Sequence, residues 1–238
     1  MRYVRDLLHE LITSKEIDTK TLSLKSLDVA LDRQRWRVYV VSLCRRPDTA
    51  LQWLHYGRSG AGVAIGFKTS HIERVPFRLS QVLYDRARQV EWCRSIVAAV
   101  DDALDKVLRT MPGDSERELL GELARDSLAT QIWSISPLMK HPAFLGEDEW
   151  RLVAHVPSGP GVPEGSESEG ATYFRQVANR IVPYKEIKFE TLPVVEIILG
   201  ASTPIEEDRV ALQVLMEETL VQSDDIKVTK SPVSVRPS

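Results

Sequence analysis

Two glutamates and an arginine alternate in the segment GEDEWRLV, residues 146–153. In an extended chain Glu147, Glu149 and Arg151 project from one face, because successive side chains of a strand point to opposite sides. A guanidinium beside a carboxylate holds that carboxylate ionised, and such a group can orient a substrate hydroxyl or stabilise a developing positive charge. These three residues are therefore the candidate catalytic set. The alternative is an acidic turn followed by a surface ion pair that contributes little stability.

The segment LQWLHYGRSGAGVAIGF, residues 51–67, places aromatic residues and a histidine before several glycines. A dinucleotide loop needs its glycines after a strand and before a helix, so that phosphate meets the helix N-terminus. Here the order is reversed, since a helix is predicted to end at Gly57 and a strand to follow. The P-loop pattern is also absent, because no glycine–lysine–serine/threonine run occurs. Instead, Gly62 and Gly66 share a strand face nearly bare of side chains, which lets a ligand or another backbone approach closely.

Other common chemistries find little support in the sequence. The histidines and acidic residues show no metal-ligand spacing, so no metal site is expected. No G-x-S-x-G nucleophile elbow occurs. Cys44 and Cys93 lie far apart and outside any C-x-x-C pair, which predicts two free thiols of structural character. His55 is a candidate general base, but a lone histidine between aromatic residues more often serves packing or lies at the surface.

Composition narrows the class of protein. The 238 residues carry a net charge of −3 and 43% hydrophobic residues, as in ordinary globular proteins. There is no basic excess of the kind that nucleic-acid binders show. No apolar run approaches the roughly 18 residues of a membrane span, and the charged N-terminus lacks the apolar core of a secretory signal. We therefore expect a cytoplasmic protein without a membrane partner. The oligomeric state is not indicated.

Hydrophobic periodicity predicts the elements that position these residues. Helices are expected at 2–13, within 17–35, at 47–57, at 86–110 and from 115 to 136, with Ser115 and Glu118 as a capping box. Strands are expected at 38–44, 62–67, 81–85, 149–156, 173–177, 181–189, 194–200 and 226–231, the first of them buried on both faces. The order predicts an α+β fold, a single mixed sheet with an inserted helical pair (86–136) and flanking helices. We expect one domain over 1–238, with a flexible loop at 157–170 rich in Pro, Gly, Ser and Glu.

The ordered motifs resemble those of the domain of unknown function 2971 family, which is common in bacteria. The shared pattern is a W-x-x-Y-G segment, a G-x-x-I-G-F strand, an E-x-E-W-R-L strand, a P-Y strand and an I-x-x-G strand. In this chain these motifs fall on Trp53, Tyr56 and Gly57; Gly62, Ile65, Gly66 and Phe67; Glu147, Glu149, Trp150, Arg151 and Leu152; Pro183 and Tyr184; Ile197 and Gly200. The resemblance runs from about residue 36 to 237. Family members usually begin with a histidine-bearing strand before this region, so we expect either an upstream start or a shortened relative.

The resemblance implies fold kinship and no settled activity. A second, more distant likeness to ADP-ribosyltransferases implies an NAD-using enzyme in a bacterial defence or toxin system. By that analogy Glu149, with Glu147, would stabilise the ribosyl cation, and Tyr56 or Trp53 would stack on nicotinamide. Trp53, Tyr56, Gly57, Gly62 and Gly66 then form the candidate substrate-binding set, and NAD would be a substrate alongside a small molecule or protein.

Two other functions compete with this one. The first is a non-catalytic protein-interaction module, in which the same residues serve packing and an ion pair. The weaker second is a phosphoesterase or nuclease, for which neither a metal cluster nor a basic groove is visible. The enzyme hypothesis expects Glu149, Tyr56 and the bare strand face to line one cleft.

Overall fold

A computed structural model gives the fold. It describes residues 2–18, 24–32, 36–72, 78–110, 113–157, 171–189, 193–203 and 226–235, together with positions 210, 211, 214 and 218. The predicted loop therefore lies almost wholly outside the described residues. The chain divides into two compact units. Unit 1 comprises residues 1–40, 80–145 and 153–168, and unit 2 comprises residues 41–79, 146–152 and 169–238. The single domain over 1–238 stays a prediction.

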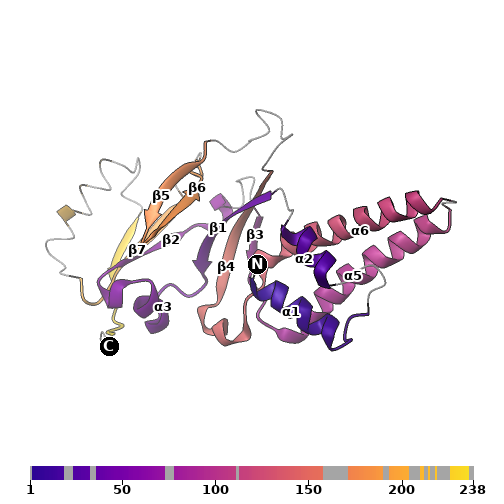
Figure 1. The fold of residues 1–238 in the computed structure, drawn as a ribbon. Coiled ribbons are helices and arrows are strands. Elements are labelled where there is room, and N and C mark those ends of the chain that lie inside the picture. The colour runs from indigo at the N-terminus through magenta and orange to yellow at the C-terminus, as the bar shows by residue number, and fades with distance from the viewer. Residues whose placement is uncertain are drawn as a thin grey trace. The chain divides into compact units, whose positions relative to one another are not determined.

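Unit 1 is built on four helices, α1 (Arg2–Thr13), α2 (Leu24–Asp32), α5 (Arg86–Leu108) and α6 (Asp114–Ile135). The long helices α5 and α6 lie side by side as a hairpin (Figure 1). The core of the unit contains the apolar stripe of α1, which the helical spacing predicted, and apolar residues of the other three helices: Val4, Leu7, Leu8, Leu11, Leu27, Leu31, Cys93, Val97, Leu128 and Ile132. Both predicted members of the inserted helical pair are therefore present.

The start of α6 differs from the prediction. Gly113 is the N-cap, and its backbone N–H donates to the Glu116 carboxylate at 3.2 Å. The predicted capping box of Ser115 and Glu118 is wrong by two residues. The structure uses a G-x-x-E spacing, Gly113 with Glu116, and glycine has no side chain to give the usual capping signal in the sequence.

A buried glutamine joins three segments of unit 1. Gln89 on α5 is 0% exposed. Its amide nitrogen donates to the carbonyls of Leu83 (2.6 Å) and Lys140 (2.8 Å), and its amide oxygen accepts from the Tyr3 hydroxyl at 2.6 Å. Leu83 also forms a parallel bridge with Met139. Burial raises the pKa of Tyr3, which keeps its hydroxyl protonated as a donor across the neutral pH range.

The strands form three small sheets among the described residues, not the single mixed sheet that was predicted. The first has the order β1 (Trp36–Cys44), β4 (Glu149–Pro157), β3 (Arg78–Gln81); the second has the order β2 (Val63–Phe67), β7 (Val194–Leu199), β8 (Lys227–Lys230). The third is the hairpin of β5 (Tyr173–Val177) and β6 (Arg180–Tyr184). The α+β class is confirmed. The sheet count is wrong because alternation of side chains indicates the faces of a strand and not its partners.

Two strands differ in detail from their predictions. β3 ends at Gln81, where the predicted strand was to begin. β1 is an edge strand, and Val40 and Val41 on it are 43% and 42% exposed. The prediction that this strand is buried on both faces is therefore wrong. A β-branched run is equally suited to an exposed edge, since propensity measures fit to a pleated surface rather than depth.

The remaining short elements are α3 (Ala50–His55), η1 (Arg58–Gly60), α4 (Thr69–Ile72), η2 (Ser136–Leu138) and η3 (Pro142–Glu147).

Close backbone packing explains why glycine stands at positions 60 and 200. In unit 2, Gly200 N–H donates to Gly62 O and Ser202 N–H donates to Gly60 O, both at 2.9 Å. A Cβ on Gly200 would lie 2.1 Å from Gly60 O, and Gly60 has a φ of +86°. The glycines thus let the turn before β2 lie directly on the end of β7.

Candidate functional site

A cavity of about 620 Å³ lies within unit 2. We call it the β1–β2 pocket. Residues of β1, the segment around α3, β2 and α4 line it, with single contributions from β3, β4 and β7: Ser42, Leu43, Cys44, Arg45, Pro47, Gln52, Trp53, Tyr56, Gly57, Val63, Ala64, Ile65, Gly66, Phe67, Thr69, Ile72, Leu79, Trp150 and Ile198. Most of these side chains are apolar, and the described lining contains no carboxylate.

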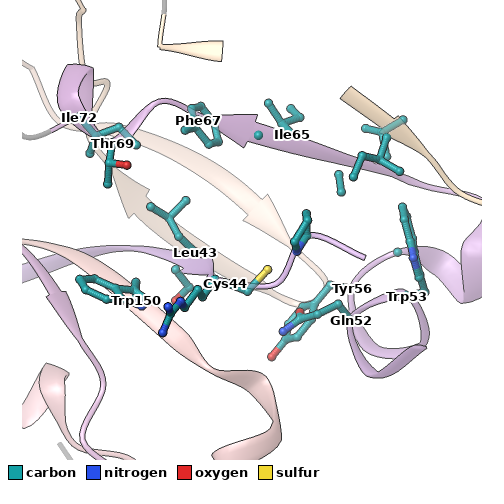
Figure 2. A pocket seen from close by; sticks show the side chains of 18 of the residues that line it. Leu43, Cys44, Gln52, Trp53, Tyr56, Ile65, Phe67, Thr69, Ile72 and Trp150 are labelled. Atoms are coloured by element: carbon teal, nitrogen blue, oxygen red, sulfur yellow. The ribbon is translucent and has the colours of Figure 1, made fainter. Parts of the chain in front are cut away.

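The pocket lies between β1 and β2 and extends along both strands. Figure 2 shows Ile65 and Phe67 of β2 on one side and Leu43, Cys44 and Trp150 on the other. Consecutive residues line it, 42–44 at the end of β1 followed by Arg45, and 63–67 of β2. Because neighbouring side chains of a strand point to opposite faces, a continuous run indicates that the cavity borders the strand's edge as well as a face.

One end of the pocket is formed by the α3 segment, which carries Gln52, Trp53 and Tyr56 (Figure 2). The hydroxyl of Thr49 caps α3 by accepting from Gln52 N–H. Trp53 is buried, and its indole N–H donates to Asp48 Oδ1 at 2.5 Å. Ser231 Oγ donates to the same carboxylate oxygen at 2.6 Å. Asp48 therefore fixes the tryptophan wall and attaches the segment after β8 to it.

A few polar groups accompany the apolar lining. The Cys44 thiol donates to Arg46 O at 3.2 Å, and partial burial raises its pKa above that of an ordinary cysteine. The thiol is therefore protonated at neutral pH and not poised as a nucleophile. The Trp150 indole nitrogen is buried and has no hydrogen-bond partner in the described part of the chain. Because this nitrogen is closed off from solvent, it is not a donor that a ligand in the cavity can reach.

The predicted catalytic residues do not line this pocket. Arg151 donates from Nε and Nη2 to the two carboxylate oxygens of Glu149 at 2.8 and 2.9 Å, and Glu149 is only 6% exposed. This pair confirms the predicted contact between the two residues but places it on the face of β4 opposite to Trp150, which does line the pocket. Glu147 lies at the end of η3, where its backbone oxygen accepts from the Gln52 side chain at 3.2 Å.

The predicted substrate-binding residues are mostly in the pocket. Trp53, Tyr56, Gly57 and Gly66 line it, and Tyr56 is 68% exposed. Gly62 does not; a Cβ there would lie 3.1 Å from Gly57 O, so its role is to let two backbone segments meet. Sequence reasoning missed Cys44 and Trp150. The alternation of β4 did place Trp150 on the face opposite to Glu149. The sequence of the strand does not show which of its two faces borders a cavity.

Comparison with known proteins bears on the same region. Residues 52–152 match the family described as Protein of unknown function (DUF2971). Over this segment the chain belongs to the DUF2971 family. No curated protein and no solved structure matches it. The matched DUF2971 segment includes the α3 segment, β2 and the start of β4, and it leaves the pocket residues of β1 and β7 outside.

Two further findings concern membrane insertion and metal binding. Among the helices of the described ranges, none is both long and apolar enough to cross a membrane. Within the same ranges, no three His, Cys, Asp or Glu side chains come together in a group that could hold a metal ion.

Proposed function

We propose that the β1–β2 pocket binds a mostly apolar ligand and that this DUF2971 protein acts as a binding module. The observation that supports this function is the composition of the lining, which is aromatic and aliphatic and has no carboxylate among the described residues. The volume is within the roughly 300–1,000 Å³ typical of ligand pockets. The proposed setting is the bacterial cytoplasm, as the sequence predicts.

The lining suits a ligand that is apolar where it enters the cavity. Leu43, Ile65 and Phe67 offer apolar contact from two sides, and burial of such surface contributes about 25 cal/mol per Å². A cationic group placed inside the cavity would lose its hydration, and the described lining has no carboxylate to compensate it.

We expect the uncharged dye N-phenyl-1-naphthylamine to bind this pocket saturably with a stoichiometry of one, measured by its fluorescence increase. Alkylation of Cys44 with a biphenyl maleimide should abolish binding, because the adduct occupies the cavity. Cys44→Ser treated with the same reagent should still bind the dye. Dye binding that is absent, or that survives alkylation of Cys44, would contradict the proposal.

The chain's second cysteine does not interfere with this test. Cys93 is 0% exposed, and burial raises its pKa to about 11. Burial raises the pKa of both thiols, so accessibility is what separates them: the reagent reaches the exposed Cys44 and not the buried Cys93. Cys44 has an exposed position at the pocket, so mass spectrometry should show one adduct on the folded chain and two after denaturation.

The ADP-ribosyltransferase-like function is the second candidate. The buried Glu149 carboxylate, held by two hydrogen bonds from Arg151, is the observation that favours it. It requires the carboxylate and a stacking aromatic side chain to face one substrate, whereas Tyr56 lines the pocket and Glu149 does not. NAD would be its substrate.

For a binding module we expect Glu149→Gln to lower the free energy of unfolding by about 2–4 kcal/mol, because Arg151 loses a charged partner in a largely buried site. Neither the wild type nor the Glu149→Gln variant should consume NAD. The measurements are urea denaturation and the consumption of labelled NAD in the presence of cell extract. Glu122→Gln, at an exposed position of α6, should leave stability unchanged. NAD consumption by the wild type that disappears in Glu149→Gln would support the transferase instead.

A further inference from the structure

We propose that the ligand of the β1–β2 pocket is an extended polypeptide segment, which adds as a strand to the open edge of β2. This inference rests on the proposed ligand-binding function of the pocket and names the class of ligand. In the described part of the chain β2 pairs with β7 alone, so its other edge has no strand beside it. An edge of this kind is a template for another chain.

The register of β2 and β7 shows which backbone groups face that edge. Gly62 lies opposite Gly200, whose N–H donates to Gly62 O, so this is a hydrogen-bonded pair. In an antiparallel ladder such pairs alternate with pairs whose N–H and C=O groups point away from each other. Val63 and Ile65 occupy the outward-facing positions, opposite Leu199 and Ile197.

The far side of β7 confirms this assignment. Leu199 O accepts from Ser231 N–H at 2.8 Å, so the backbone of Leu199 faces the β8 side and not β2. Val63, its partner across the ladder, therefore directs its own N–H and C=O away from β7. Val63 and Ile65 together offer two donors and two acceptors at strand spacing, which an extended peptide matches and a compact small molecule does not.

The side chains along this edge set the pattern of the incoming segment. Val63, Ile65 and Phe67 share one face of β2 and are 51%, 49% and 38% exposed. Their period of two residues is the period of a β-strand, so alternate residues of an added strand would lie beside them. The segment should therefore be apolar at alternate positions.

Basic residues of the protein predict which residues flank the bound peptide segment. Arg45 lines the pocket, and Lys68 and Arg58 stand on either side of β2 in the sequence. None of the three has an ion-pair partner among the residues that the structure describes. The chain as a whole has a net charge of −3, whereas the charged side chain in the described lining is the cationic Arg45. Acidic residues at the ends of the segment complement it.

Amide hydrogen exchange tests the open edge without any ligand. In the free protein the Val63 and Ile65 amides should exchange at least about a hundredfold faster than those of Ala64 and Gly66, which face β7. Equal protection of all four amides would mean that the edge is already covered and would overturn the inference. Protection of Val63 and Ile65 that rises with protein concentration would place a second copy of the chain there, and would overturn it as well.

The binding test uses a fluorescein-labelled pool of peptides Glu-Φ-Thr-Φ-Thr-Φ-Glu, blocked at both ends, in which Φ is Val, Ile, Leu, Phe or Tyr. We expect saturable binding by fluorescence polarisation and protection of the Val63 and Ile65 amides. A pool with proline at both threonine positions, which lacks those backbone donors, should bind at least about tenfold more weakly.

A matched pair of variants separates the backbone from the side chain. Ile65→Pro removes an N–H that faces the open edge, where proline is tolerated, and should abolish peptide binding. Ile65→Thr keeps the N–H and should retain binding within about threefold. Dye binding without peptide binding would leave the pocket function standing and refute strand addition, whereas failure of both dye and peptides would refute both.

Discussion

Replacement of Gln89 by leucine is expected to lower the free energy of unfolding by about 3–5 kcal/mol. The side chain is fully buried and bonds to the Leu83 and Lys140 carbonyls and to the Tyr3 hydroxyl. Leucine has a similar volume, so the change isolates the hydrogen bonds. Each buried group left without a partner costs about 1–3 kcal/mol. The loss is large against the roughly 5–15 kcal/mol that stabilises a typical domain.

The measurement for Gln89 is urea denaturation followed by far-ultraviolet circular dichroism, which reports the helices of unit 1. Gln131→Leu on α6 is the matched control, because Gln131 makes only a long side-chain contact with Ser127 at 3.5 Å. Its change should stay within about 0.5 kcal/mol, as for surface substitutions generally. Equal midpoints for the two variants would show that the Gln89 network contributes no stability.

Alanine at two glycines should change stability in opposite directions. A Cβ on Gly200 would lie 2.1 Å from Gly60 O, a backbone atom that cannot move without breaking the turn before β2. Gly200→Ala should therefore destabilise unit 2 by at least about 3 kcal/mol. On α6 the nearest atom to a Cβ on Gly121 is a flexible arginine nitrogen at 3.4 Å. Gly121→Ala should stabilise by about 0.5–1 kcal/mol, because alanine has the higher helix propensity.

Thermal unfolding of both alanine variants beside the wild type is the measurement for this pair. The expected order of midpoints is Gly121→Ala, wild type, Gly200→Ala. A Gly200→Ala variant as stable as the wild type would mean that β7 and the turn before β2 do not approach as closely as the structure has them. A destabilised Gly121→Ala would point instead to an unseen packing contact on α6.

Local periodicity predicted the helices well, as α1 illustrates. Val4, Leu7, Leu8 and Leu11 recur at helical spacing, and the helix has the predicted bounds with all four side chains buried. Sheet organisation was not predictable in the same way. β2 pairs with β7, a strand distant in sequence, and the sequence of neither strand indicates that the other is its partner. Non-local pairing of this kind is the reason that one sheet was expected where the described residues form three.

The site was predicted in part for a similar reason. Trp53, Tyr56, Gly57 and Gly66 line the pocket because the aromatic segment and the bare strand face are adjacent in sequence. The choice of Glu149 depended on which face of β4 meets the cavity. Alternation showed that Glu149 and Trp150 lie on opposite faces, but only the three-dimensional arrangement shows that the tryptophan faces the pocket.

The hydrogen bond from Ser231 to Asp48 has a consequence for biosynthesis. The two residues are 183 positions apart, and Asp48 orients the tryptophan that forms one wall of the pocket. A nascent chain on the ribosome therefore carries the aromatic segment and the apolar edge of β2 long before β7, β8 and Ser231 have been translated. Throughout that interval β2 lacks β7, the strand with which it pairs, and unpaired strand edges are prone to wrong association. Premature termination within the last strands would yield a chain whose pocket is unfinished and whose apolar edge is available to chaperones.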